Sequence, residues 1–125
     1  MMQSAPFSIF LATTDADASR RFYGETLGLK LVSEDDFALV FQLAGAELRI
    51  SKVPAFTPQP FTVLDWQVTD IAAAQAGLAS RGVEPVLFDG MDQDERGIWK
   101  VPGAPVRILW FKDPDGNVLS VSQRG

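Results

Sequence analysis

The sequence predicts an α+β fold that consists of two βαβββ modules. Strand-like runs rich in β-branched and aromatic residues surround only two helical segments. Each helical segment starts at a Thr-Asp pair and closes at a glycine, first over residues 15–28 and then over residues 70–82. The two starts lie 55 residues apart and the two closing glycines lie 54 apart. This spacing predicts an internal duplication, against the alternative that common strand and cap chemistry recurs by chance.

The first predicted module covers roughly residues 5–55. Asp15 or Asp17 can cap its helix by accepting a backbone hydrogen bond in the first turn. An acidic turn at 34–36 and an Ala-Gly-Ala turn at 44–46 separate its last three strands. The expected elements are a strand at 7–14, a helix that ends at Gly28, and strands at 29–33, 37–43 and 47–53.

A Pro-rich connector at 54–60 precedes the second predicted module, which covers roughly residues 61–124. An Asp-Pro-Asp-Gly-Asn turn at 113–117 joins its last two strands as a hairpin. The expected elements are a strand at 61–69, a helix at 70–82, and strands at 83–88, 106–112 and 118–123. We expect a single domain over residues 1–125, because this length is too short for two independent cores.

Composition limits the classes of function. The chain has 46% hydrophobic and 22% charged residues, which is typical of a globular protein. A net charge of −5 disfavours nucleic acid as a partner, because phosphate backbones bind to basic surfaces. The chain has no cysteine, which excludes disulfides and thiolate chemistry. No apolar run is long enough to span a bilayer and no leader pattern opens the chain, so we expect a cytoplasmic protein without membrane contact.

Two stretches resemble the signatures of a known family. The first is Phe-Tyr at 22–23 followed by Leu-Gly-Leu at 27–29, and the second is Phe-Lys-Asp-Pro-Asp-Gly-Asn at 111–117. In this order, inside two βαβββ modules, they are similar to the glyoxalase/bleomycin resistance protein/dioxygenase superfamily, also called vicinal oxygen chelate. The resemblance implies a curved mixed sheet around a concave chamber, with the helices outside. It also implies a small-molecule ligand and a homodimer, since many members are dimers.

The resemblance permits a test for a metal site. In metal-dependent members, four side chains reach into the chamber from the first and last strands of each module, and they are usually His, Gln or Glu. The matching positions here are Ser8, Arg49, Val63 and Ser120. This set does not suit a divalent ion, because Val63 has no donor atom, Arg49 has a fixed positive charge and the chain has no His. We therefore expect no metal and no other cofactor, which disfavours glyoxalase-type isomerisation and extradiol oxygenation.

Strand alternation extends the set of residues expected to line the chamber. Arg49 is the main candidate for a ligand contact, because a guanidinium can hold a carboxylate, phosphate or carbonyl oxygen with two hydrogen bonds. A structural ion pair of Arg49 with Asp65 or Glu47 is the alternative. Without a cationic partner, Asp65 would be a candidate acid or base. A bulge would reverse the alternation beyond it. The expected ligand-binding strand residues are Ser8, Phe10, Arg49, Val63, Asp65, Gln67 and Ser120.

The three Trp residues of the chain are further candidates, because indole rings stack on flat or cationic ligands. Strand alternation places Trp66 in the core. Of the neighbours Trp110 and Phe111, we expect Trp110 to face the chamber. Trp99 follows a polar loop at 90–97, which is placed where a lid would be, and we expect it to contact ligand or to be an ordinary loop residue.

The sequence leaves three functions open. The first is a metal-free protein that binds a small organic molecule, by sequestering an antibiotic or another toxic compound. The second is a metal-independent lyase or isomerase that uses Asp65, Glu47 or Tyr23 for proton transfer and Arg49 to stabilise negative charge. The third is a dimeric interaction module with a vestigial site.

Overall fold

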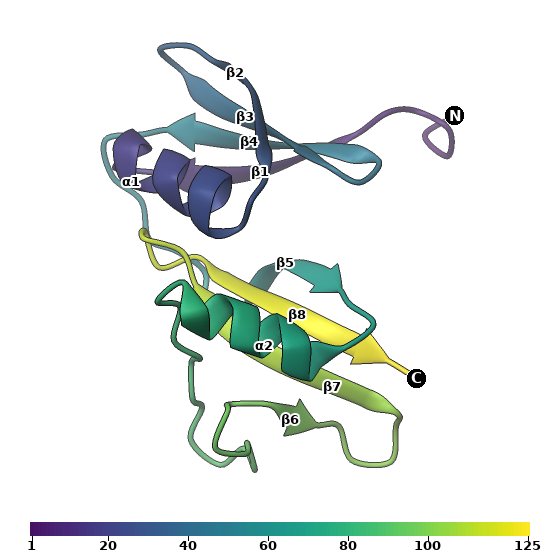
Figure 1. Ribbon diagram of the computed structural model, residues 1–125. Helices are drawn as coiled ribbons and strands as arrows, with labels where there is room; N and C mark the ends of the chain where they lie inside the picture. Colours follow the sequence, from purple (N-terminus) through teal and green to yellow (C-terminus); the bar gives the residue numbers. More distant parts are fainter. The chain divides into compact units, whose positions relative to one another are not determined.

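The computed structural model describes residues 1–125, which divide into two compact units. The first unit is Met1–Thr57 and the second is Pro58–Gly125 (Figure 1). The boundary lies inside the Pro-rich segment at 54–60. No helix is both long enough and apolar enough to cross a lipid bilayer.

The first unit is a four-stranded mixed sheet with one helix. Its strands lie in the order β1-β4-β3-β2, with β1 parallel to β4 and the other neighbours antiparallel. A short α-helix continues directly into a π-helical turn, η1, which ends before Gly28. The elements are β1 (Ser8–Thr13), α1 (Ala16–Arg21), η1 (Phe22–Thr26), β2 (Lys30–Glu34), β3 (Ala38–Leu43) and β4 (Ala46–Lys52).

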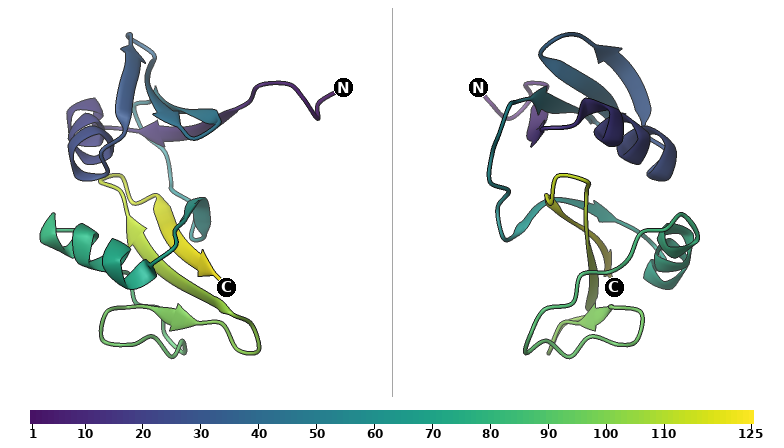
Figure 2. Two further views of the ribbon diagram at one scale, coloured as in Figure 1. Left: turned by 45° about the vertical axis from the view of Figure 1, so that its right-hand side comes forward. Right: turned by 90° about the vertical axis from the view of Figure 1, so that its left-hand side faces the viewer.

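The second unit repeats this arrangement. Its strands lie in the order β5-β8-β7-β6, with β5 parallel to β8 (Figure 2). The elements are β5 (Thr62–Gln67), α2 (Ile71–Ser80), β6 (Trp99–Lys100), β7 (Val106–Lys112) and β8 (Val118–Arg124). Both units therefore have the order βαβββ and the same sheet topology. This confirms the predicted α+β class and the two similar modules.

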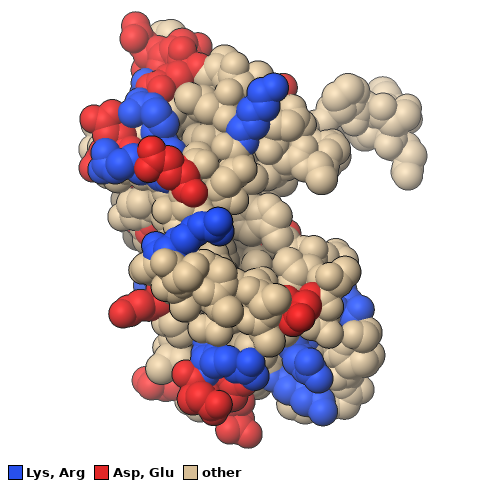
Figure 3. Space-filling view, viewed as in Figure 1, with Lys and Arg blue, Asp and Glu red and all other residues tan.

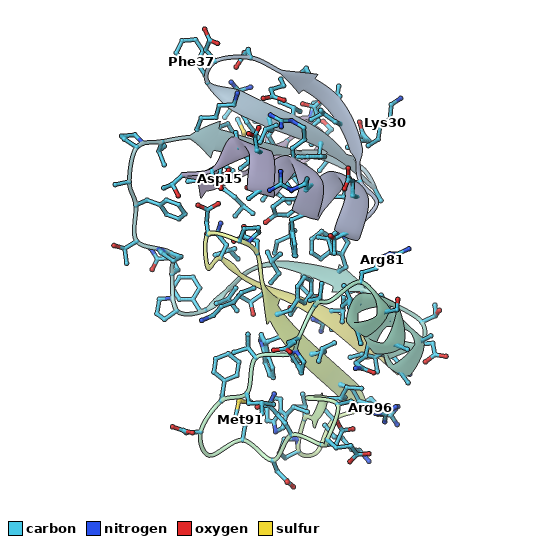
Figure 4. All side chains as sticks on the ribbon, turned by 60° about the vertical axis from the view of Figure 1, so that its left-hand side comes forward. Asp15, Lys30, Phe37, Arg81, Met91 and Arg96 are labelled. Atoms are coloured by element: carbon cyan, nitrogen blue, oxygen red, sulfur yellow. The ribbon has the colours of Figure 1, made fainter.

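Both helices begin in the same way. The Asp15 carboxylate accepts a hydrogen bond from the Ala18 amide at 3.1 Å, and the Asp70 carboxylate accepts one from the Ala73 amide at 3.1 Å (Figure 4 labels Asp15). Each aspartate has extended backbone and satisfies an amide that has no partner within its helix. Asp15 is therefore the cap of α1, and Asp17 lies inside the first turn.

The core of the first unit lies on one face of its sheet. Leu39 and Phe41 of β3 pair with Ile50 and Leu48 of β4, and all four side chains are fully buried. Tyr23 of η1 packs against this layer, with its ring centroid 5.8 Å from that of Phe41. Because Tyr23 is 0% exposed, its hydroxyl is not accessible from solvent.

The core of the second unit lies between the sheet and α2, which contacts β7 and β8. Phe111 of β7 and Leu119 of β8 are paired and buried on the helix side. The Trp66 ring stacks on Phe111 at a centroid distance of 6.4 Å. Trp66 therefore faces the core, as its position in the strand predicts.

The strand expected at residues 83–88 does not form, and this part of the prediction is wrong. Pro85 has no amide hydrogen, and only Val86 of this segment donates a backbone hydrogen bond to β7, to the Trp110 carbonyl at 2.8 Å. The Gln93 side-chain amide bonds instead to the Val86 carbonyl at 3.0 Å and to the Phe88 amide at 2.8 Å. The edge position beside β7 belongs to the two-residue strand β6.

A cluster of charged side chains joins α1, β2 and β4 at the surface of the first unit. Glu34 accepts two hydrogen bonds from Arg20, at 2.6 and 2.8 Å, and one from Lys52 at 2.9 Å. Figure 3 shows basic and acidic side chains next to each other over the region of α1. The hydrogen bonds from Arg20, and then from Lys52, lower the pKa of Glu34 to about 2.

We expect Glu34→Gln to reduce the acid dependence of stability. The pKa of Glu34 in the folded protein, about 2, lies below the ordinary value of 4.5. The ionised Glu34 side chain therefore stabilises the fold at pH values above 4.5, and this stabilisation is lost as the pH falls toward 2. Urea unfolding at pH values from about 5 to about 2 should therefore show a flatter decline for the variant than for the wild type. Glu95→Gln removes an exposed carboxylate that forms no ion pair and serves as the control. Parallel declines in wild type and Glu34→Gln would contradict this expectation.

Candidate functional site

A carboxylate held by two serines marks one face of the second sheet. Asp65 of β5 pairs in register with Ser120 of β8. The Ser120 and Ser122 hydroxyls donate to the two Asp65 carboxylate oxygens at 2.6 and 2.7 Å, and both serines are buried. No Lys or Arg side chain of the second unit forms an ion pair with Asp65. Within its own unit, Asp65 is therefore fixed in place by neutral donors and has no counter-ion.

Three aromatic side chains meet on the same face of this sheet. Trp110 of β7 pairs with Ser120, and its ring centroid lies 5.9 Å from that of Trp99 and 5.3 Å from that of Phe88. All three rings remain partly exposed. The Trp110 indole Nε1 donates to the Thr62 hydroxyl at 3.0 Å. Since β8 lies between β7 and β5, the Trp110 indole extends over β8 to reach β5, the strand that carries Asp65.

A register shift near the start of β5 changes which residue joins this face. Thr62 pairs with Val118 and Leu64 pairs with Leu119, so Val63 is the extra residue on its strand. Thr62 consequently shares a face with Ser120 and reaches Trp110. The alternation expected through Val63 is interrupted, although it holds from Asp65 onward, where Gln67 pairs with Ser122 at an exposed position.

The polar loop before β6 is held by side-chain hydrogen bonds. The Gln93 amide nitrogen donates to the Gly97 carbonyl at 3.0 Å as well as to Val86. The Asp94 carboxylate accepts from the Arg96 amide at 2.8 Å and the Ile98 amide at 3.0 Å (Figure 4 labels Met91 and Arg96 in this region). Burial would raise the pKa of Asp94, but these amide bonds and the Arg96 charge together lower it. These hydrogen bonds order the loop, and its residue Gln93 forms a β-bridge with Trp99.

The first sheet carries a second group of candidate residues. Phe10 of β1 pairs in register with Arg49 of β4, and the Arg49 guanidinium carbon lies 6.0 Å from the centre of the Phe10 ring. Ser8 pairs with Glu47 two residues before the Phe10–Arg49 pair, and so lies on the same face. Arg49 forms no ion pair with Glu47, so that alternative from the sequence is not observed. Phe10 is 64% exposed.

Comparison with known proteins identifies the family. The family model for the Glyoxalase/Bleomycin resistance protein/Dioxygenase superfamily matches residues 6–121. The chain belongs to this superfamily. The comparison with curated proteins found no match.

Solved structures of superfamily proteins are similar to this chain over its whole length. The antibiotic-binding protein TnmS3 from a Streptomyces species is 26% identical with a TM-score of 0.74, and the match covers 100% of this chain and 99% of that chain. The genomically encoded fosfomycin resistance protein FosX from Listeria monocytogenes is 14% identical with a TM-score of 0.77, covering 99% and 96%. A glyoxalase/bleomycin resistance protein/dioxygenase from Alicyclobacillus acidocaldarius is 16% identical with a TM-score of 0.72, covering 99% and 95%. At 14% and 16% identity, the proteins from Listeria monocytogenes and Alicyclobacillus acidocaldarius show only that this chain shares their fold.

The residues of this superfamily member do not fit a metal at the positions where metal-dependent members have ligands. Of Ser8, Arg49, Val63 and Ser120, only the two serines carry a neutral oxygen, and the Ser120 hydroxyl donates its proton to Asp65. Within either unit, no three His, Cys, Asp or Glu side chains are grouped so that they could hold a metal ion. A divalent ion requires several carboxylate, imidazole or thiolate donors that converge.

The predicted site residues form two groups, one in each unit. Asp65, Ser120, Trp99 and Trp110 share one face of the second sheet, whereas Ser8, Phe10 and Arg49 share one face of the first. Sequence reasoning missed two residues of the second face, Thr62 and Phe88. Thr62 joins through the register shift, and Phe88 through a segment that was expected to be a strand.

We expect Ser122→Ala to destabilise the fold. The Ser122 hydroxyl is 1% exposed and donates to the Asp65 carboxylate, so its removal leaves a carboxylate oxygen without a partner. A loss of about 1.5–3 kcal/mol in the free energy of unfolding, measured by urea denaturation, is expected for a hydrogen bond to a charged group. Ser80→Ala is the control, because the Ser80 hydroxyl bonds to the Gly77 carbonyl at an exposed position. Equal stability of Ser122→Ala and wild type would contradict a structural role for this bond.

Proposed function

We propose that this superfamily member binds a flat aromatic or cationic organic molecule, without a metal, on the face of the second sheet that carries Trp99, Trp110 and Asp65. The observation that carries the proposal is the cluster of Trp110, Trp99 and Phe88, three partly exposed aromatic side chains, on the same sheet face as a carboxylate that has no counter-ion within its own unit. Such a surface offers ring faces for stacking and one fixed hydrogen-bond acceptor.

The charge of the site favours a ligand with a positive group or an N–H donor. Asp65 already accepts from Ser120 and Ser122, and a carboxylate can accept further hydrogen bonds with its remaining lone pairs. Indole faces attract cations, and the net charge of −5 raises the local concentration of cationic ligands. The two serine hydroxyls hold the carboxylate before the ligand arrives, which reduces the entropy lost on binding.

The comparison with TnmS3 supports an antibiotic or a similar toxic compound as the ligand and sequestration as the result. That protein is described as antibiotic binding, and at 26% identity it matches this chain over its full length. Sequestration requires affinity alone, so it needs no proton-transfer pair. Arg49, beside Phe10 on the first sheet, is a separate candidate contact for an acidic or carbonyl group.

The binding function is better supported than the metal-independent lyase or isomerase. Tyr23 is fully buried, and Glu47 is exposed and forms no ion pair. The Asp65 carboxylate accepts hydrogen bonds from two neutral hydroxyls, and no second titratable group bonds to it to share in proton transfer.

The homodimer stays a prediction, which light scattering of the purified protein tests.

A ligand screen tests the proposal. Chelator-treated protein is titrated with aromatic antibiotics, aromatic amines and aromatic acids, and intrinsic Trp fluorescence and thermal stability are recorded. Saturable quenching with a raised melting temperature, stronger for aromatic amines than for aromatic acids, is the expected result. Binding that appears only after a divalent metal is added, or turnover of a compound, would overturn the proposed function. Absence of any saturable response across the panel would do the same.

A further inference from the structure

A pocket of about 440 Å³ lies at the start of α2 and is separate from the aromatic face. Its apolar part is formed by Ile71, Ala72 and Ile98, and its charged rim includes Lys100 and Arg107. We call this feature the basic pocket. Arg107 and its neighbour Ile108 point to opposite faces of β7, so the basic pocket lies on the helix side of the second sheet and not on the Trp110 side.

Three backbone features build the basic pocket. Lys100 of β6 and Arg107 of β7 are direct partners in the antiparallel register, which places both side chains on one face. Arg107 pairs in turn with Gln123 of β8. The Gln123 side-chain oxygen accepts a hydrogen bond from the Ile71 amide at 2.9 Å, which fixes the first residue of α2 beside these strands.

The charged side chains that line the basic pocket are three basic ones, Arg96, Lys100 and Arg107, and two acidic ones, Asp92 and Asp94, which leaves one net positive charge. Lys100 and Arg107 form no ion pair, although like charges directly opposite each other on paired strands destabilise a sheet. Of the pocket's acidic side chains, Asp94 is occupied by the Arg96 and Ile98 amides and by the Arg96 guanidinium at 3.4 Å. An anion placed between Lys100 and Arg107 would relieve their repulsion.

We propose that the basic pocket is a second binding site, which takes a small organic molecule with one carboxylate or phosphate group. Arg107 provides a planar fork for two oxygen atoms and Lys100 provides a point charge. The apolar part of the ligand lies on Ile98 and Ala72. Asp92, an exposed carboxylate on the pocket wall, repels a second anionic group and so selects against polyphosphates. This site is independent of the proposed function, because it uses the opposite face of the sheet.

Isothermal titration with phenyl phosphate, benzoate and inorganic phosphate tests the second site. The wild type should bind phenyl phosphate or benzoate saturably and more tightly than inorganic phosphate, because only the organic anions cover the apolar part. The double variant Lys100→Gln/Arg107→Gln should bind at least about tenfold more weakly. Preference for phenyl phosphate or for benzoate identifies the natural group as phosphate or carboxylate.

The matched control is Arg21→Gln/Lys30→Gln, which removes the same charge from exposed positions of the first unit and should leave binding unchanged. Trp99→Ala should also leave binding of these anions unchanged, which separates this site from the aromatic face. The proposal is overturned if neither organic anion binds saturably, or if the control weakens binding as much as the pocket double variant. It is also overturned if inorganic phosphate binds as tightly as both organic anions.

Discussion

Gly97→Ala should destabilise the protein by about 2–5 kcal/mol, through left-handed backbone strain and a steric clash. Gly97 has a φ of 83°, a conformation that residues with a Cβ rarely adopt. A Cβ at this position would lie 2.5 Å from the Cβ of Pro85. The Gly97 amide also donates to the Asp94 carbonyl and its carbonyl accepts from Gln93, so the loop cannot shift without losing these bonds. The free energy of unfolding from urea denaturation gives the effect.

Alanine substitutions at two other glycines distinguish the effect of backbone strain from that of the steric clash. Gly90 has a φ of 80° but no atom within 4 Å of its ideal Cβ, so Gly90→Ala should cost only the strain of about 1–2 kcal/mol. Gly77 lies inside α2 with open space around its ideal Cβ, so Gly77→Ala should stabilise the helix by up to about 1 kcal/mol. If Gly97→Ala costs no more than Gly90→Ala, then Pro85 is not packed against Gly97 as described.

Trp99→Ala should weaken binding of the ligand found in the screen by about tenfold to a hundredfold, because Trp side chains are frequent binding hot spots. Trp99 is partly exposed, and its ring contacts Trp110 at the edge of the aromatic cluster. The two-residue strand β6 pairs with β7 through its backbone, so removal of the indole leaves the strand intact. Isothermal titration of both proteins with the same compound measures the change.

Trp66→Phe is the matched control for Trp99→Ala. Trp66 stacks on Phe111 in the core, on the opposite face of the same sheet. Its replacement should lower stability and leave the affinity unchanged. If Trp66→Phe weakens binding and Trp99→Ala does not, the ligand does not bind on the Trp99 face.

Local signals explain why most of the fold could be predicted from the sequence. Asp15 and Asp70 cap the two helices through their own carboxylates, so the chemistry that starts each helix is visible in the residue itself. The turn at 113–117 is similarly local, because the Asp113 carboxylate accepts from the Asp115 and Asn117 amides. Alternation placed Trp66 in the core and Trp110 on the other face, since Trp66 follows the register shift of β5 and Trp110 lies in a strand of regular register.

The errors come from contacts between distant residues. The segment at 83–88 has the composition of a strand, but the Gln93 side chain binds its Val86 carbonyl and Phe88 amide, and no local pattern indicates this. The extra residue at Val63 depends on the register with β8, so its effect on Thr62 is not visible in β5 alone. Strand alternation did not reveal that Ser120 and Ser122 would bind both oxygens of the Asp65 carboxylate.

The most direct test of metal-free binding on the second sheet is isothermal titration of one ligand from the screen into chelator-treated wild type and Trp99→Ala. The wild type should saturate with the same affinity before and after addition of zinc, manganese or nickel, and the variant should bind more weakly under both conditions. Wild-type binding that requires the added metal, or equal affinity of the two proteins, would contradict the proposed site.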